Sequence, residues 1–400
     1  MKKQILFLLL LFLTTSLFVK ESNAIPAFAR KYRLSCKTCH SPSAPRLKDY
    51  GDSFAGQGFK LADEESPRYY VPAGDEKLSL IRDFPIAVRF DGHVTYSSSN
   101  NSSDFGTPYL MKILSGGELS QNLSYYFYFY MNEKGELAGV EDAYLMYDNL
   151  FNTELDIMLG QFQVSDPLYK RELRLSLEDY VLYTSKIGIS DITLKYDRGL
   201  MLTYGFKSGT DVVMEVINGN GIPEQELNLF DKDKYKSYMA RISQSIGEYL
   251  SVGGFGYFGM EKQGEGINEI TNEVMIAGPD LALAFGEKFS FIFQYTYRED
   301  SEVYLSLDPA DDIMENVETF GILSEVIYSP KGDQSDWYLL GMYNKVDSDF
   351  ELANYESVTI HAGYLLRRNV RLATEYSYVM EDPLMGNDFG KFSLGVISAF

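Results

Sequence analysis

The chain has 400 residues, and its 36 Lys and Arg against 57 Asp and Glu give a formal net charge of −21. This balance excludes nucleic acid as a partner, because a phosphate backbone requires a basic surface. The composition is rich in Tyr (31), Phe (26) and Gly (33) and holds a single Trp. Such a composition favours strands that are apolar on one face only, as in outer-membrane β-barrels.

Residues 1–24 are predicted to be an export signal. Two lysines follow the initiator methionine, the run 5–19 is almost wholly apolar, and small residues precede a cleavage point after Ala24. The run is shorter than the ~20 residues of a spanning helix, which argues against a membrane anchor. Removal of this segment takes three Lys and one Glu, so the mature chain carries 33 basic and 56 acidic residues, a charge of −23. This negative charge would attract cations or a basic partner, or it serves only to keep the outer loops hydrated.

The two cysteines of the chain are followed at once by a histidine, in the order Cys36-Lys37-Thr38-Cys39-His40. In an exported chain this spacing predicts one covalent c-type haem, with the two thiols on the porphyrin vinyl groups and His40 on the iron. A disulfide between the cysteines would close a small loop with little gain in stability and would leave His40 unexplained. A thioredoxin-like pair would require a βαβ setting, and zinc would require two further ligands nearby.

The second axial ligand of this iron has to come from elsewhere, because residues 25–80 contain no other histidine and no methionine. The iron is therefore either five-coordinate or capped by the remainder of the chain. His93 and His361 are the histidine candidates, and there are several methionines. Both histidines fall on the side of their strands expected to face the lumen, where a lone histidine is also an ordinary pore-lining residue.

Composition divides the mature chain into three parts. Residues 25–62 hold the haem motif and are expected to form short helices. Residues 63–83 carry Pro, Gly and charge and are expected to be a linker. Residues 84–400 alternate between apolar and polar positions, as strands of 10 to 14 residues do. In the first strand, one face takes Ile86, Val88, Phe90, Val94 and Tyr96, and the other takes Ala87, Arg89, Asp91, His93, Thr95 and Ser97.

We expect an all-β fold, a transmembrane antiparallel barrel of about 16 strands whose lumen is plugged by the small helical haem segment. The final strand alternates and ends at Phe400, as outer-membrane barrels do, whereas a soluble β-sandwich is the alternative. The expected strands are 84–97, 108–120, 123–133, 139–149, 153–163, 198–207, 210–219, 234–246, 248–260, 269–284, 287–298, 316–329, 334–347, 355–367, 369–381 and 389–400.

The links between these strands predict the orientation of the barrel. Short turns at Asn122 and Asn369 are expected on the periplasmic side, and the long links 98–107, 164–197, 220–233 and 299–315 outside. The link 164–197 can fold inward as a constriction that carries Lys170, Arg171, Glu172 and Arg174. Acidic loop residues can gather hard cations such as Fe(II), although solvated charge is their commoner role; they are Glu299, Asp300, Glu302, Asp308, Asp311, Asp312 and Glu315.

The N-terminal residues resemble the fused monohaem cytochrome–porins, which include outer-membrane iron-oxidising cytochromes. The matching stretches are Pro26-Ala27-Phe28-Ala29-Arg30-Lys31-Tyr32, Ser35-Cys36-Lys37-Thr38-Cys39-His40, Pro45-Arg46-Leu47-Lys48-Asp49-Tyr50-Gly51-Asp52-Ser53-Phe54 and Gly58-Phe59, and Gly160-Gln161-Phe162-Gln163-Val164-Ser165-Asp166-Pro167 is similar to a strand and loop of the group. The resemblance implies that Cys36 and Cys39 are the thioether sites and His40 the proximal ligand. The motif does not separate iron oxidisers from relatives with other electron partners.

These features predict outer-membrane electron transfer between an extracellular donor, with Fe(II) favoured, and a periplasmic cytochrome or other carrier; whether the chain acts as an Fe(II) oxidase is open. Outward transfer to an extracellular metal, a diffusion porin with a redox-gating haem plug, and a soluble periplasmic haem protein are the alternatives. No hydrolase motif such as G-x-S-x-G or H-E-x-x-H occurs, and three histidines support little acid–base chemistry.

Overall fold

The computed structural model describes residues 27–32, 34–61, 70–72, 79–81, 84–120, 122–264, 268–306, 313–367 and 369–400. The predicted export signal, most of the predicted linker, and Asp308, Asp311 and Asp312 lie outside the described residues.

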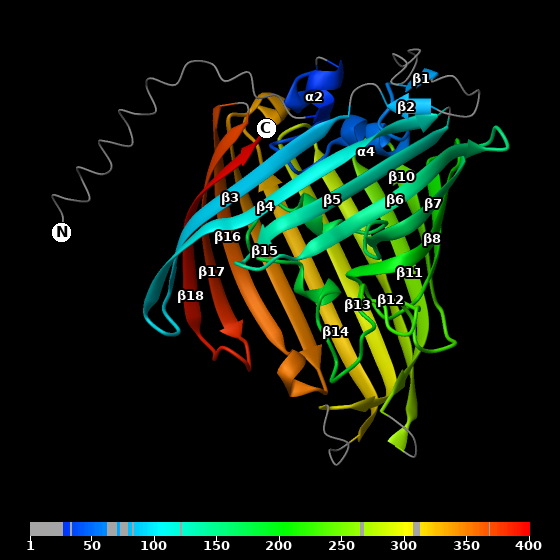
Figure 1. Ribbon diagram of the computed structural model, residues 1–400. Helices are drawn as coiled ribbons and strands as arrows, with labels where there is room; N and C mark the ends of the chain where they lie inside the picture. The colour runs from blue at the N-terminus through cyan, green and yellow to red at the C-terminus, as the bar shows by residue number, and fades with distance from the viewer. Residues whose placement is uncertain are drawn as a thin grey trace.

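Strands β3 to β18 form one closed antiparallel barrel, in which each strand pairs with its neighbours in sequence and β18 pairs with β3 (Figure 1). All sixteen predicted strands are present, so the all-β barrel is confirmed and the soluble sandwich is wrong. The strands are β3 (Ile86–Ser97), β4 (Ser102–Ser120), β5 (Leu123–Glu133), β6 (Gly139–Leu150), β7 (Leu155–Gln163), β8 (Tyr196–Gly205), β9 (Thr210–Ile217), β10 (Ser237–Ile246), β11 (Leu250–Gln263), β12 (Ile270–Phe285), β13 (Phe289–Tyr304), β14 (Ile313–Tyr328), β15 (Trp337–Ser348), β16 (Tyr355–Arg367), β17 (Val370–Glu381) and β18 (Phe389–Ala399).

The two faces of the barrel wall differ as the alternation predicts. In β3 the predicted inward residues Ala87, Asp91 and His93 are buried, and the predicted outward Val94 and Tyr96 are exposed. Large apolar side chains recur on the exterior, for example Leu159, Met214, Ile242, Met275, Ile360 and Leu394. A closed wall of this kind leaves no unpaired strand edge and presents hydrocarbon to lipid, as an outer-membrane barrel must. Among the described helices, none has the length and apolar character needed to cross a membrane.

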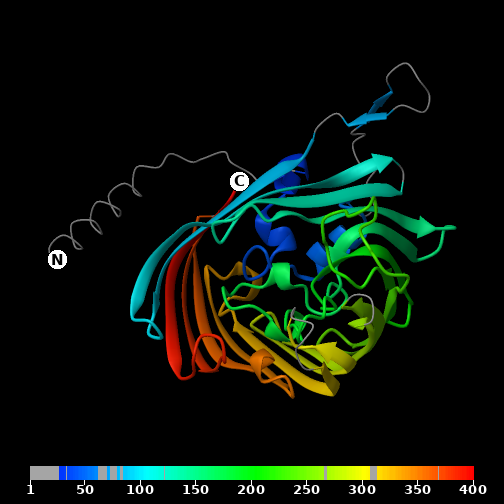
Figure 2. The ribbon, with the colours of Figure 1, turned by 60° about the horizontal axis from the view of Figure 1, so that its bottom comes forward.

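The N-terminal segment forms three short helices, α2 (Ala27–Tyr32), α3 (Cys36–Cys39) and α4 (Asp49–Gly56), and is followed by the small hairpin β1 (Tyr70–Pro72) and β2 (Ser79–Ile81). The helices lie at the end of the barrel that also holds the C-terminus (Figure 1). The tilted view of Figure 2 shows the blue N-terminal segment reaching into the ring of strands. Because the short turns gather at this end, it is the periplasmic mouth.

Two predicted outer loops are shorter than expected. The pairing of β3 with β4 continues up to the partners Ser97 and Ser102, so β4 begins at Ser102. The predicted link 98–107 is therefore only a tight turn over 98–101. Strand β13 likewise continues to Tyr304, opposite Ile313. Residues 299–302 therefore lie in a paired strand and not on a flexible acidic loop. Asp300 is fully buried and accepts a hydrogen bond from Arg298, so the prediction that 299–302 belong to an extracellular loop is wrong.

The link between β7 and β8 folds into the lumen, which confirms the predicted inward constriction (Figure 2). It contains two 3₁₀ turns, η1 (Arg171–Leu173) and η2 (Val181–Tyr183). Its apolar side chains pack against the inner wall and form the main hydrophobic core of the protein; they include Val164, Leu168, Leu175, Tyr180, Tyr183, Ile192 and Leu194. Two further 3₁₀ turns of the same length lie at η4 (Gly332–Gln334) and η5 (Glu351–Ala353). The lumen is therefore divided between this inward segment and the N-terminal helices.

Candidate haem site and outer vestibule

The haem motif forms one tight turn, and the chain that follows it returns so that Leu47 lies beside His40. The N–H of His40 donates to the carbonyl of Cys36 at 2.9 Å, which closes helix α3, and His40 forms a β-bridge with Leu47. The N–H of Lys48 then donates to the carbonyl of Cys39 at 3.0 Å. Cys36 and Cys39 are not joined in a disulfide, and both line one cavity together with His40. The structure thus brings the three predicted haem residues together.

Gly51 allows helix α4 to lie directly against this turn. A Cβ at Gly51 would collide with the carbonyl oxygen of Cys39 and would lie 3.0 Å from its Cα. Both atoms belong to the backbone, so neither can rotate away. The close contact of α3 and α4 therefore requires glycine at position 51, which gives a physical reason for the glycine of the resembling motif.

Replacing Gly51 by alanine is expected to push α4 away from the haem turn, at a cost of about 1–3 kcal/mol for forced overpacking. The fraction of purified barrel that carries haem should fall several-fold, measured as haem absorbance per polypeptide. Gly56→Ala is the matched control in the same helix, because no atom lies within 4 Å of a Cβ built there. Equal haem content in both variants would contradict the role assigned to Gly51.

An aromatic cluster joins the haem segment to the barrel wall. Phe28 stacks on Phe59 with ring centroids 4.7 Å apart, and the edge of Phe54 contacts both rings. Phe59 in turn stacks on Tyr126 of β5 at 5.2 Å, and the hydroxyl of Tyr32 donates to the carbonyl of Phe59 at 2.6 Å. The aromatic residues of the resembling motif are therefore the small core of this segment and its apolar contact with the wall.

Ionic contacts attach the same segment to three parts of the barrel. Arg46 Nη1 donates to Glu325 Oε1 of β14 at 2.6 Å. Lys60 Nζ lies 3.0 Å from Asp148 of β6, and Lys48 Nζ lies 2.5 Å from Asp333 in η4. The segment is thus held across the lumen by cations that meet carboxylates of the wall. The sequence analysis did not predict these pairs, although an excess of basic residues in residues 25–62 of an otherwise acidic chain was a signal for them. The basic residues of that segment are Arg30, Lys31, Arg33, Lys37, Arg46, Lys48 and Lys60, and its acidic residues are Asp49 and Asp52.

The cavity lined by the motif has the size and chemistry that a haem requires. Its volume is about 690 Å³, within the range of roughly 300–1,000 Å³ that small-molecule and cofactor pockets occupy. Its walls combine aromatic and aliphatic side chains with cations that are each paired with a carboxylate of the protein. The apolar set includes Phe54, Phe59, Leu114, Tyr126, Leu168 and Tyr180, and the cations include Arg46, Lys112 and Lys170. The residues present therefore fit the cofactor that the motif predicts. We call the cavity of Cys36, Cys39 and His40 the haem cavity, after the predicted cofactor.

The histidine is oriented as a haem ligand would be. Its Nδ1 lies 3.2 Å from the carbonyl oxygens of Pro45 and Arg46, so Nδ1 carries the proton and Nε2 is the nitrogen left to ligate iron. Burial lowers the pKa of His40, while the bonds to the two carbonyls act in the opposite direction. A neutral imidazole with a fixed tautomer is the form that binds metal. Burial also raises the pKa of the Cys39 thiol.

The two histidines considered as second axial ligands lie elsewhere. His93 and His361 both face the lumen, as predicted, but line a separate small cavity with Asp91, Arg371 and Glu375. The Nε2 of His361 lies 3.1 Å from the Tyr338 hydroxyl and its Nδ1 lies 2.9 Å from Glu375, so both nitrogens are occupied. Neither nitrogen of His93 has a hydrogen-bond partner among the described residues. The structure therefore does not bring either histidine to the cavity of Cys36, Cys39 and His40.

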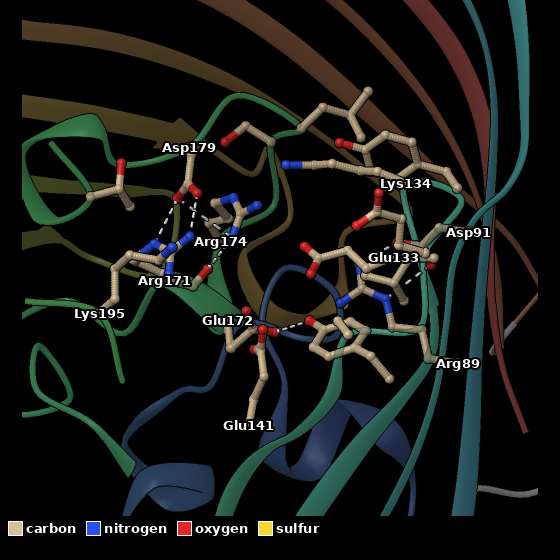
Figure 3. A pocket seen from close by; sticks show the side chains of 18 residues that line it. Arg89, Asp91, Glu133, Lys134, Glu141, Arg171, Glu172, Arg174, Asp179 and Lys195 are labelled. Carbon is tan, nitrogen blue, oxygen red and sulfur yellow. Dashed lines mark hydrogen bonds and ion pairs between the residues drawn. The ribbon is translucent and has the colours of Figure 1, made fainter. Parts of the chain in front are cut away.

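A second cavity, of about 630 Å³, is lined in part by the link between β5 and β6, at the end of the barrel opposite the short turns; Figure 3 shows its side chains. On one side Arg171 and Arg174 of the inward segment bond Asp179; burial raises the pKa of Asp179, but the two guanidinium groups outweigh it and hold that pKa well below its usual range. On the other side Arg89 makes a two-pronged contact with Asp91. We call this cavity the outer vestibule; its charged lining residues are Arg89, Asp91, Glu133, Lys134, Glu136, Glu141, Arg171, Glu172, Arg174, Asp179 and Lys195.

Arg89 and Glu172 line both the outer vestibule and the haem cavity, and so form part of the partition between them. Glu172 accepts hydrogen bonds from Lys112 at 2.8 Å and from the Tyr130 hydroxyl at 2.7 Å. The predicted constriction residues Arg171, Glu172 and Arg174 thus lie at the vestibule. Among the residues that the structure describes, no group of three or more His, Cys, Asp or Glu is arranged to hold a metal ion.

No family model and no curated protein matches the chain. Solved structures do match it over 80% of its length. One is an anion-selective porin from Comamonas acidovorans, with 10% identity, 99% of that chain covered and a TM-score of 0.56. Another is the outer membrane channel DcaP of Acinetobacter baumannii, with 14% identity, 97% of that chain covered and a TM-score of 0.55. A third is a loop L8 deletion mutant of OmpT, an outer membrane protein of Vibrio cholerae, with 14% identity, 99% of that chain covered and a TM-score of 0.54. The fold is therefore the sixteen-stranded porin-like barrel of the Gram-negative outer membrane, and its apolar exterior is suited to that membrane.

Proposed function

We propose that this porin-like barrel transfers single electrons through one covalent c-type haem, which Cys36, Cys39 and His40 hold inside the periplasmic half of the lumen. The observation that carries the proposal is the cavity of about 690 Å³ that these three residues line together within the ring of strands. A haem bound there supplies reversible one-electron chemistry. The chain contributes the two thiols, a histidine with its tautomer fixed by the carbonyls of Pro45 and Arg46, and a mostly apolar wall.

The outer vestibule is the proposed route for an extracellular partner. It lies on the side opposite the termini and meets the haem cavity at Arg89 and Glu172. Its lining holds six carboxylates against five cations, so the wall is close to neutral with one negative charge in excess. We propose Fe(II) as the donor, in line with the family resemblance: Fe(II) would lose one electron and become Fe(III), and a haem held by Cys36, Cys39 and His40 would supply the one-electron acceptor.

The electron then passes to a periplasmic carrier. The haem segment lies at the mouth where the short turns and the C-terminus gather, so a carrier that docks there approaches the cavity from inside the cell envelope (Figure 1). A single haem does not bridge an apolar band ~25 Å tall together with the outer loops, so the donor has to enter the lumen while the carrier stays at its inner mouth. The same geometry permits the reverse flow, to an extracellular metal acceptor.

A diffusion porin gated by the haem segment is the second candidate, favoured by the fold shared with porins and by the ionic attachment of the segment across the lumen. In that case solute flux would change with the oxidation state of the haem, and electrons would not need to leave the protein.

The test uses the full-length protein, first weighed by mass spectrometry and then reconstituted in liposomes. The Fe(II) supplied outside is a free ion small enough to enter the outer vestibule, whereas the oxidised soluble cytochrome enclosed inside is too large to pass the lumen. A strong Fe(II) chelator enclosed with the cytochrome captures any ion that crosses the barrel. Reduction of the enclosed cytochrome at a rate proportional to haem content supports electron transfer. Sugar permeation without haem turnover supports the gated porin instead, and a polypeptide mass without added haem overturns both.

A further inference from the structure

Two methionines of the barrel wall line the same cavity as the haem motif. Met158 of β7 and Met201 of β8 are direct cross-strand partners, so their side chains leave the wall at adjacent points. Among the described residues that line this cavity, they are the sulfur donors other than the two cysteines, and His40 is the histidine. In cytochromes c, a methionine thioether is a well-known second axial ligand beside histidine.

These methionines lie at the same depth as the haem segment. Met146 of β6 is the register partner of Met158, so the three form one row across the inner wall. The haem segment reaches the first member of this row, because a Cβ at Gly58 would come 3.5 Å from Met146 Cε. The neighbouring Lys60 bonds Asp148 two residues further along β6. The row is therefore adjacent to residues 58–60 at the C-terminal end of the haem segment, and Met158 shares the cavity of the motif.

The two sulfur donors differ in how firmly they are packed. Met201 is 4% exposed and belongs to the main hydrophobic core, together with Phe162 and Leu168. Met158 is only half-buried and packs at the margin of that core. An unbranched side chain with three rotatable bonds can redirect its sulfur at little cost when one side of it is open. Met158 is therefore the donor able to turn toward a group in the cavity without opening the core.

We propose that Met158 supplies the second axial ligand of the haem iron, opposite His40. This inference rests on the proposed haem function and names a residue of the barrel wall as part of the site. It means that the cofactor is completed only when the haem segment is seated in the lumen. His93 and His361 are not used, since they line a different cavity.

The test is the visible and near-infrared spectrum and the reduction potential of the purified full-length protein with Met158→Leu. Leucine conserves volume and is expected to leave the barrel folded. We expect loss of the near-infrared absorption that thioether ligation gives to ferric haem, a lower potential because methionine ligation raises it, and binding of carbon monoxide by the ferrous form. Met158→His should restore a six-coordinate spectrum of the bis-imidazole type.

Met201→Leu is the matched control, because it alters the cross-strand partner and should keep the wild-type spectrum. A spectrum that changes in Met201→Leu but not in Met158→Leu would overturn the assignment, as would a wild-type haem without thioether absorption. Loss of this signal in His93→Ala alone would overturn it as well. These results differ from failure of the proposed function, in which the mature polypeptide carries no haem at all.

Discussion

The variant Cys36→Ala/Cys39→Ala is expected to carry no covalent haem and to lose electron transfer entirely. Both thiols line the haem cavity and are the only cysteines of the chain, so no other side chain can form a thioether. The barrel itself should fold, because its strands pair with one another and the cysteines lie in helix α3, outside those strands. The measurements are the mass of the mature polypeptide and the rate at which liposomes containing the variant reduce an enclosed acceptor.

Single variants extend this test. Cys36→Ala and Cys39→Ala each retain one thiol and His40, and should therefore hold haem at reduced yield through one thioether. A wild-type rate of electron transfer in the double variant would show that the motif does not carry the redox group. Folding of each variant is verified by the shift in gel mobility that heating produces in intact barrels.

Replacing Glu325 by alanine is expected to detach the haem segment from the barrel wall. The Glu325 side chain is 0% exposed and accepts a hydrogen bond from Arg46 of the haem segment at 2.6 Å and another from the Tyr180 hydroxyl of the inward segment at 2.9 Å. One carboxylate thus joins the three parts of the lumen. Its loss leaves a buried guanidinium without its partner, at a cost of about 3 kcal/mol.

The measurements are limited proteolysis of the haem segment and conductance of single barrels in a planar bilayer, and both should increase in Glu325→Ala. Asp336→Asn is the control, because its contact with Lys37 is 3.8 Å long and its side chain is 58% exposed, so the expected change is below about 1 kcal/mol. The variant Arg46→Ala/Glu325→Ala should recover part of the loss, since it removes the unpaired charge. Unchanged proteolysis and conductance in Glu325→Ala would contradict this role.

The fold could be predicted almost completely from the sequence. Every predicted strand corresponds to an observed one, and 123–133 and 355–367 agree at both ends. The agreement is physical, because a wall between lipid and lumen forces side chains to alternate at every second residue. The largest errors, of six residues each, lie at the outer ends of β4 and β13, which continue beyond the predicted strands. Pairing there depends on backbone hydrogen bonds to the neighbouring strand, and no change in hydrophobicity marks its end.

The candidate site could be predicted only in part. The residues Cys36, Cys39 and His40 followed from their spacing, because two thioethers and one iron ligand on a single porphyrin leave little freedom in sequence. The second axial position did not follow. His93 and His361 share the lumen face with Met158 and Met201. Alternation alone therefore cannot decide which of these four residues lies nearest to the haem motif.

The sequence by itself therefore determined the strands, their two faces and the haem motif, each of which is a local pattern of a few residues. Only the tertiary structure decided which lumen residues meet that motif. Depth along the barrel depends on the register of sixteen paired strands and on where the inward segment and the haem segment pack, and a shift of two residues in one strand keeps its face while changing its neighbours. Met158 lines the haem cavity and His93 does not because of this accumulated register, which no local pattern records.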